Sequence, residues 1–136
     1  MFKRIAHLCL NVRDLQQSLD FYTRLGLVPV FRFTRKGALF GVYLKLADSA
    51  FIEIFEDAKL EKPANTSLVH FCLETDDIDA VIALAKARGV DATDKKLGVD
   101  NTWQCWFEDP DGNRFEVHQY TATSTQHLGG DVEADW

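Results

Sequence analysis

Apolar positions along the chain follow two periods, one typical of strands and one typical of helices. Ile5 to Val12 is a short apolar run of strand length. From Leu15 to Leu25 apolar residues recur at helical spacing until Gly26, a residue typical of a helix end. Three more strands are then predicted, over Val28–Thr34, Phe40–Leu46 and Ala50–Phe55.

The second half of the chain repeats this order after a polar segment. Residues Glu56 to Thr66 read as a linker, because they are polar and include Pro63 and Asn65. Asp76-Asp77 supply an N-cap for a helix that runs from Ile78 to Gly89. The remaining predictions are strands over Leu68–Glu74, Thr102–Glu108 and Arg114–Tyr120, a weak strand over Val90–Lys95 and a tight turn over Asp109–Asn113.

Each half therefore reads strand, helix, strand, strand, strand. We predict an α+β fold of two tandem βαβββ modules, 1–58 and 66–120, within a single domain of 136 residues. The polar, acidic segment 121–136 lacks periodicity and is expected to be a loosely ordered tail, from which Trp136 could dock onto the domain.

The two halves also repeat a pair of ionisable residues. His7 and Glu53 are 46 positions apart, and His70 and Glu116 repeat that spacing 63 positions later. The surrounding residues repeat as well: His7-Leu8-Cys9-Leu10 aligns with His70-Phe71-Cys72-Leu73, and Ile52-Glu53-Ile54 aligns with Phe115-Glu116-Val117. Such self-similarity indicates a duplicated module.

Strand alternation predicts which way these side chains point. Leu8 and Leu10 share one face of the first strand, and His7 and Cys9 share the other. Glu53 and Glu116 each lie between apolar neighbours that point the opposite way. A single strand His is more often a hydrogen-bonded core residue, and a single Glu can be an edge-strand charge. The repeat in register, and the cost of burying an unpaired carboxylate, favour a metal site made by His7, Glu53, His70 and Glu116.

Composition and charge exclude several function classes. The net charge of −6, without a Lys/Arg cluster, argues against a nucleic-acid partner. The longest apolar runs are too short to span a membrane, and residues 1–7 show no signal-peptide pattern. Three cysteines without disulfide spacing fit a reducing compartment, so we expect a cytoplasmic protein.

Two segments carry a family resemblance. They are Asn11-Val12-Arg13-Asp14-Leu15, followed by Ser18-Leu19-Asp20-Phe21-Tyr22, and the stretch from Phe107 to Glu116 that contains Asp109-Pro110-Asp111-Gly112-Asn113. With the βαβββ–βαβββ order, they resemble the vicinal oxygen chelate superfamily, which includes glyoxalase I, extradiol dioxygenases and bleomycin-binding proteins. The resemblance covers Ile5 to Tyr120 and implies a curved mixed sheet around a cleft.

The resemblance also implies a chemistry. Family ligands come from the first and fourth strand of each module, the positions of His7, Glu53, His70 and Glu116. This four-ligand set resembles bacterial-type glyoxalase I, a metal-dependent lyase that works through an enediolate intermediate. It implies one divalent ion, Ni²⁺ or Zn²⁺ first and Co²⁺, Mn²⁺ or Fe²⁺ next, with Glu116 or Glu53 as catalytic base. Glyoxalase I has an Arg at the position of Asn11, so the resemblance supports the metal chemistry better than it supports glutathione as the substrate.

Two other functions stay open. A non-haem Fe²⁺ dioxygenase would use His7, His70 and Glu116 as its facial triad, and Glu53 disfavours it. A metal-free small-molecule binding or resistance protein of the same fold is the third possible function.

In this family sites lie between modules, often of different subunits, so we expect a homodimer in which His7 and Glu53 of one chain meet His70 and Glu116 of the other. One chain supplying all four ligands is the alternative.

Three more side chains lie near the candidate ligands. His118 shares a strand face with Glu116 and is either a polar strand-end residue or a partner of the site. Cys9 and Cys72 share faces with the ligands and are expected to be small lining thiols, since no activating basic group is evident nearby.

Overall fold

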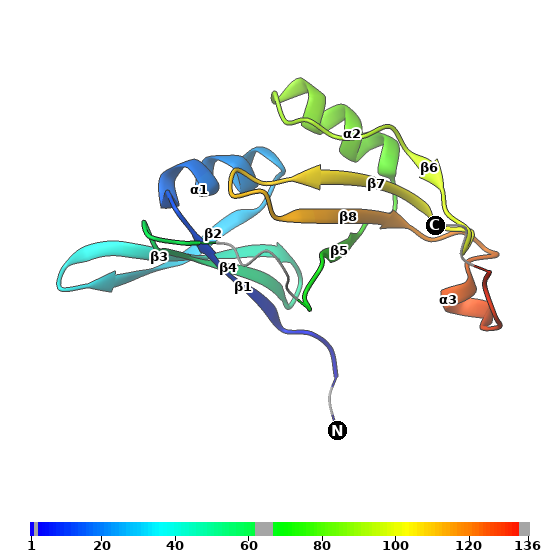
Figure 1. Ribbon diagram of the computed structural model, residues 1–136, viewed down its shortest axis with the longest axis horizontal. Helices are drawn as coiled ribbons and strands as arrows, with labels where there is room; N and C mark the ends of the chain where they lie inside the picture. Colours follow the sequence, from blue (N-terminus) through cyan, green and yellow to red (C-terminus); the bar gives the residue numbers. More distant parts are fainter. Residues whose placement is uncertain (2, 62–66, 134–136) are drawn as a thin grey trace. The chain divides into compact units, whose positions relative to one another are not determined.

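The computed structural model describes residues 1, 3–61 and 67–133. The chain divides into two compact units, Met1–Asn65 and Thr66–Trp136. The α+β fold class, with two tandem modules, is confirmed. Each module contains its own four-stranded mixed sheet (Figure 1).

The first module is a sheet with the strand order β1-β4-β3-β2 and one long helix. Strand β1 runs parallel to β4, and the other neighbours are antiparallel. The helix α1 packs against β3 and β4. The elements are β1 (His7–Val12), α1 (Leu15–Arg24), β2 (Val28–Arg35), β3 (Ala38–Ala47) and β4 (Ala50–Glu56).

The core of the first module lies between α1 and one face of this sheet. Alternate residues of β3 and β4 are buried there, and Tyr22 of the helix is fully buried with them. The opposite face carries the other alternate residues, which include Glu53. The buried sheet residues are Val42, Leu44, Ile52 and Ile54.

The second module repeats the arrangement with the order β5-β8-β7-β6. Strand β5 runs parallel to β8, and the helix α2 packs against β7 and β8. Figure 1 shows α2 lying along the β7–β8 pair. The elements are β5 (Phe71–Glu74), α2 (Ile78–Ala87), β6 (Lys96–Leu97), β7 (Trp103–Glu108), β8 (Arg114–Gln119) and α3 (Thr125–Leu128).

The two long helices begin in the same way. Asp14 accepts a hydrogen bond from the backbone N–H of Gln17 at 2.9 Å, and Asp77 accepts one from Ala80 at 2.9 Å. Both are N-cap residues with extended backbone, as the sequence indicated for Asp77.

The last strand of each module supplies a second cap to its helix. Glu56 Oε2 accepts from the N–H of Leu15 at 3.2 Å, and Gln119 Oε1 accepts from the N–H of Ile78 at 2.9 Å. These contacts tie each helix start to the strand that carries the candidate glutamate. The duplication therefore extends from sequence to hydrogen bonding.

The strand predicted over Val90–Lys95 is wrong, because the structure has the two-residue strand β6 just after it. Thr93 makes the hydrogen bonds to β7 that the backbone of a neighbouring strand would otherwise make. Its N–H donates to the carbonyl of Trp106 and its hydroxyl accepts from the N–H of Trp106, both at 3.0 Å. The Thr93 side chain therefore accepts the hydrogen bond from the backbone N–H of β7 that a neighbouring strand would otherwise accept.

The strand predicted from Leu68 begins later, at Phe71, and His70 lies just before it. Leu68 and Val69 are exposed, so burial of their side chains does not favour a strand there. The predicted linker Glu56–Thr66 lies partly outside the described residues: Glu56 ends β4, and residues 62–66 are not described.

The segment expected to be a loosely ordered tail differs from that expectation over residues 121–128. It contains α3, and the buried Ser124 donates a hydrogen bond to the carbonyl of Asn101 at 3.0 Å. Thr121 donates to the same carbonyl at 2.8 Å. Trp136 lies outside the described residues. None of the helices in the described ranges is long and apolar enough to cross a membrane.

Candidate metal centre

His7 and Glu53 meet on the sheet face of the first module that does not pack against α1. Cys9 lies opposite Glu53 in the parallel pair of β1 and β4, so His7 is the diagonal neighbour of Glu53. His7 Nε2 lies 3.2 Å from Oε1 of Glu53. The carboxylate is largely buried and the imidazole is partly exposed.

His70 and Glu116 meet with the same register in the second module. Cys72 lies opposite Glu116 in the parallel pair of β5 and β8. His70 Nε2 lies 3.6 Å from Oε2 of Glu116, and the Glu116 side chain is only 9% exposed. The structure thus brings each predicted His–Glu pair together within its own module.

An aromatic ring supports each imidazole, and the sequence reading missed this role. The Tyr43 hydroxyl lies 3.4 Å from Nδ1 of His7. The Trp106 ring contacts His70 edge-on, with centroids 4.9 Å apart. Tyr43 lies opposite Glu53 and Trp106 lies opposite Glu116. The same offset of 63 residues relates these two aromatic residues, and that spacing was the available signal.

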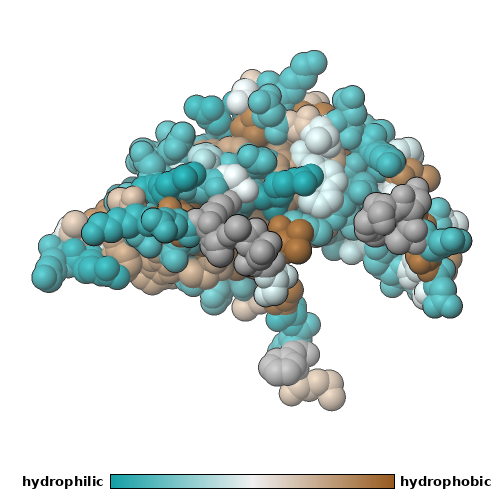
Figure 2. Space-filling model, in the orientation of Figure 1, coloured by the Kyte–Doolittle hydropathy of each residue, from teal (hydrophilic) through white to brown (hydrophobic). Residues whose placement is uncertain are grey.

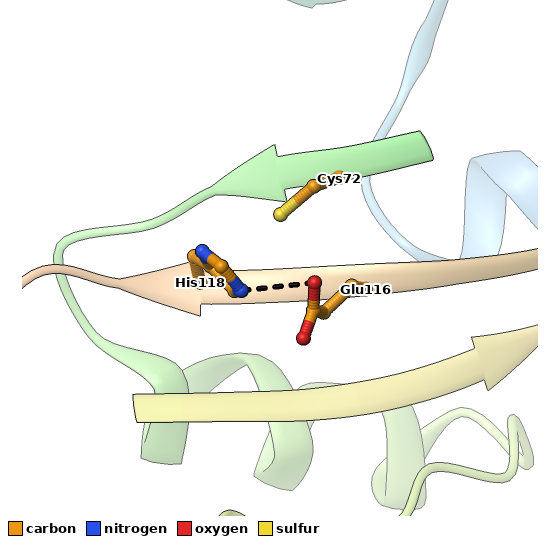
Figure 3. Close-up of side chains that lie close together, drawn as sticks. All are labelled: Cys72, Glu116 and His118. Atoms are coloured by element: carbon orange, nitrogen blue, oxygen red, sulfur yellow. Dashed lines mark ion pairs between the residues drawn. The ribbon is translucent and has the colours of Figure 1, made fainter. Parts of the chain in front are cut away.

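His118 joins the second pair. Its Nε2 lies 2.9 Å from the same Oε2 of Glu116 that His70 approaches. That nitrogen is buried and has no aligned hydrogen-bond partner within the described ranges. Of the two readings left open by the sequence, the structure supports a partner of the site (Figure 3).

Cys72 lies beside Glu116 and His118, and the three side chains form a compact group of potential metal ligands. Its thiol, a Glu116 oxygen and a His118 nitrogen lie within 4.8 Å of one another, on the neighbouring strands β5 and β8 (Figure 3). Burial and the negative charge of Glu116 raise the pKa of the Cys72 thiol to about 12. Burial and Glu53 raise the pKa of Cys9 in the same direction. Both thiols are therefore protonated at neutral pH, as lining groups would be.

The donor set fits a divalent ion. A ligand nitrogen or oxygen lies about 2.1 Å from such an ion, so neighbouring ligands of an octahedral ion lie about 3 Å apart. The His–Glu separations of 3.2 and 3.6 Å are near this value. The buried His118 nitrogen beside Glu116 and the two buried carboxylates are groups that an ion would contact.

The open face of the first module is aromatic. Six rings contact one another in a chain, with centroid separations from 4.7 to 6.4 Å. Gly41 makes this packing possible, because a Cβ there would lie 2.4 Å from the Phe55 ring. Figure 2 shows apolar colour on part of the surface of this module. The six residues are Phe31, Phe33, Phe40, Tyr43, Phe51 and Phe55.

Known proteins resemble the chain over most of its length. The chain is 31% identical over 125 residues to the uncharacterized protein YwbC of Bacillus subtilis (strain 168), which covers 88% of this chain and 99% of that protein. A glyoxalase family protein from Enterococcus faecalis has a TM-score of 0.75 and 26% identity, covering 87% of this chain and 98% of that one. A bleomycin-binding protein, solved in complex with bleomycin, has a TM-score of 0.69 and 23% identity, covering 88% and 100%.

The family itself follows from a profile match. Residues 4–117 match the Glyoxalase/Bleomycin resistance protein/Dioxygenase superfamily, a span that contains both His–Glu pairs. The chain belongs to this superfamily, which is the vicinal oxygen chelate superfamily that the sequence resembled.

Proposed function

We propose that the protein is a metal-dependent, glyoxalase I-like lyase or isomerase that acts on a small substrate with neighbouring oxygen atoms. The observation that carries the proposal is the repeated His–Glu pair, His7 with Glu53 and His70 with Glu116, in matching register. Duplication preserved a costly pair of buried carboxylates on the open sheet face, which structural packing alone does not require.

The four residues would hold one divalent ion together. Two imidazoles and two carboxylates suit Ni²⁺, Zn²⁺, Co²⁺, Mn²⁺ or Fe²⁺, with Ni²⁺ and Zn²⁺ preferred here. With four protein ligands, such an ion would still have room to bind substrate oxygens. When bound, the ion supplies Lewis-acid stabilisation of the negative charge that develops on those oxygens.

Glu116 is the proposed base. Its carboxylate removes a proton from the substrate carbon and returns it to the neighbouring carbon, so the substrate is isomerised without net gain or loss of atoms. Glu116 is more buried than Glu53, with 9% against 16% of the side chain exposed, and it contacts two imidazoles. Burial excludes water that would compete for the proton.

We further propose a homodimer in which His7 and Glu53 of one chain share the ion with His70 and Glu116 of the other. Each pair alone supplies only two ligands, which motivates pairing with the complementary set. Light scattering of the metal-loaded protein should report a dimer, and a monomer that binds metal fully would contradict the inter-chain arrangement.

Activity assays test the reaction class. Metal-loaded protein is mixed with the hemithioacetal of methylglyoxal, formed with glutathione or with a simple thiol such as cysteamine. Thioester formation, followed by its ultraviolet absorbance and lost in a Glu53→Gln/Glu116→Gln variant, supports the proposal. Oxygen uptake with catechols in the absence of thioester formation would instead support a dioxygenase.

A binding or resistance protein is the second candidate, favoured by the aromatic face of the first module. Six contacting rings would bind a flat apolar compound well. The likeness to a bleomycin-binding protein is in keeping with this alternative. Elemental analysis of the purified protein separates the two: absence of bound metal, with ligand-induced quenching of tryptophan or tyrosine fluorescence by bleomycin, would favour the binding protein.

A further inference from the structure

The second module contains a cavity of about 1120 Å³ that includes the His70–Glu116 pair. It is the larger of the two described cavities, and it extends well beyond the candidate ligands along the open face of β7 and β8. Its polar lining includes Lys96, Gln104 and Arg114. These three residues have no part in the proposed reaction.

Strand geometry places Arg114 beside the candidate metal ligands. Arg114, Glu116 and His118 alternate with the buried Phe115 and Val117, so all three side chains lie on the cavity side of β8. Same-face neighbours on a strand are about 6.5 Å apart along the chain direction. That spacing is close to the length of a short dicarboxylic acid.

Trp106 orients the Arg114 side chain. The guanidinium carbon lies 4.8 Å from the centre of the Trp106 ring, and the same ring contacts His70. A guanidinium stacked on an aromatic face keeps its N–H edges available for a planar anion. Lys96, opposite Gln104 in the β6–β7 pair, adds a second positive charge to the lining.

These cations lack carboxylate partners. Neither Arg114 nor Lys96 takes part in an ion pair within the part of the chain that the structure describes. The chain as a whole has a net charge of −6. Two cations without carboxylate partners in one cavity therefore provide local positive charge there, opposite in sign to the net charge of the protein. Gathered positive charge in a cleft favours an anionic ligand.

The carboxylates that line the same cavity already have partners. Asp100 accepts hydrogen bonds from the Gln126 side chain and the Thr102 N–H. Burial opposes its ionisation, but these hydrogen bonds hold the pKa of Asp100 below its usual value. Glu116 is in contact with His70 and His118. Neither carboxylate neutralises the two cations.

We propose that this cavity binds a small carboxylic acid, whose carboxylate pairs with Arg114 and Lys96 while its neighbouring oxygens face the His70–Glu116 pair. The proposal rests on the function proposed above, because an ion held by these ligands would bind the neighbouring oxygens. It adds the substrate class: an anionic compound with vicinal oxygens at one end and a carboxylate about one strand repeat away. Arg114 is then a specificity-determining residue, and Trp106 positions it.

A matched pair of chelating probes tests the proposal on the full-length protein. 2-Oxoglutarate and 2-oxopentanoate have the same 2-oxo acid group and five carbons, but only 2-oxoglutarate has a distal carboxylate. Binding of each to the Co²⁺-loaded protein is measured by calorimetry and by the Co²⁺ absorption spectrum. We expect 2-oxoglutarate to bind at least about tenfold more tightly, the effect of one charge-assisted hydrogen-bonded pair.

Variants test whether Arg114 causes the preference for 2-oxoglutarate. Arg114→Gln should reduce it to less than about threefold, while Co²⁺ affinity and 2-oxopentanoate binding stay unchanged; Arg114→Lys should retain part of it. Arg35→Gln is the matched control, because Arg35 also stacks on an aromatic ring, 4.2 Å from Phe40, but in the first module. It should leave the preference intact.

The outcomes separate the two proposals. Failure of the wild-type protein to bind Co²⁺ would overturn the proposed function and this inference with it. Co²⁺ binding without a preference for 2-oxoglutarate, or an equal loss in Arg35→Gln and Arg114→Gln, would overturn this inference alone.

Discussion

His118 Nε2 lies 2.9 Å from Oε2 of Glu116, and the described residues of the first module show no equivalent contact. The offset of 63 residues places Phe55 at the matching position, where it packs among Phe33 and Phe40. The duplicated modules have therefore diverged beside the conserved pair. The first presents an aromatic face, and the second presents imidazole, amide and cationic groups.

This contact predicts a change in metal affinity. His118→Phe, which copies the first module, should weaken Co²⁺ binding by about tenfold, because groups that orient a metal ligand contribute on this scale. Calorimetric titration measures the effect. Adding Phe55→His, the reciprocal change in the first module, to His118→Phe should not restore the lost Co²⁺ affinity. Unchanged affinity in His118→Phe would mean that the contact is only packing.

The two glutamates should be needed for turnover. Glu116→Gln removes the proposed base and should lower kcat by about 10²- to 10⁴-fold, the range for general base catalysis. Glu53→Gln should abolish turnover mainly through the metal site, and His7→Ala should lose metal. Steady-state kinetics with parallel metal analysis separates these effects. A fully active Glu53→Gln/Glu116→Gln double variant would contradict the mechanism.

The helix caps should contribute equally in the two modules. Asp14→Ala and Asp77→Ala each remove an N-cap hydrogen bond of 2.9 Å and should lower the free energy of unfolding by about 1 kcal/mol. Chemical denaturation monitored by circular dichroism checks this. Asp48→Ala, which removes only an exposed contact with Lys45, is the control and should have no measurable effect. A loss in one module alone would argue against equivalent caps.

The Cys72 thiol should react slowly with alkylating agents. Its pKa of about 12 lies above the ordinary value of 9.0, so the folded protein favours the protonated form and the thiolate appears only as pH approaches 12. At pH 8 the thiolate fraction falls by about a thousandfold relative to an ordinary thiol. Iodoacetamide labelling with mass spectrometry of the Cys72 peptide measures this, with the guanidinium-unfolded protein as reference. Equal rates in the folded and unfolded states would refute it.

The sequence was sufficient for the fold and for the two His–Glu pairs because both depend on local periodicity and on an internal repeat. The repeat fixed the register of Glu53 and Glu116 relative to His7 and His70, and strand alternation gave their faces. The position of β6 was not predictable, since Thr93 bonds to Trp106 through its side chain. The ordered segment at Ser124 depends on the distant carbonyl of Asn101. Such long-range hydrogen bonds leave no periodic signal.

The stacking of Arg114 on Trp106 could not be read from the sequence for a related reason. The two residues are on different strands, and their contact depends on the pairing of β7 with β8. The sequence placed Arg114 at the start of a strand but gave no indication of its partner. The same pairing brings Gln104 opposite His118, which makes the cavity lining polar.

The number of metal ions bound per chain shows whether the two His–Glu pairs share one ion. Metal-free protein is titrated with Co²⁺ by calorimetry, and the washed complex is analysed for cobalt per chain. We predict one ion per chain, with affinity reduced by His7→Ala and by His70→Ala alike, because both pairs would hold the same ion. No bound cobalt would contradict the metal site, and two ions per chain, each lost independently with one pair, would contradict a shared one.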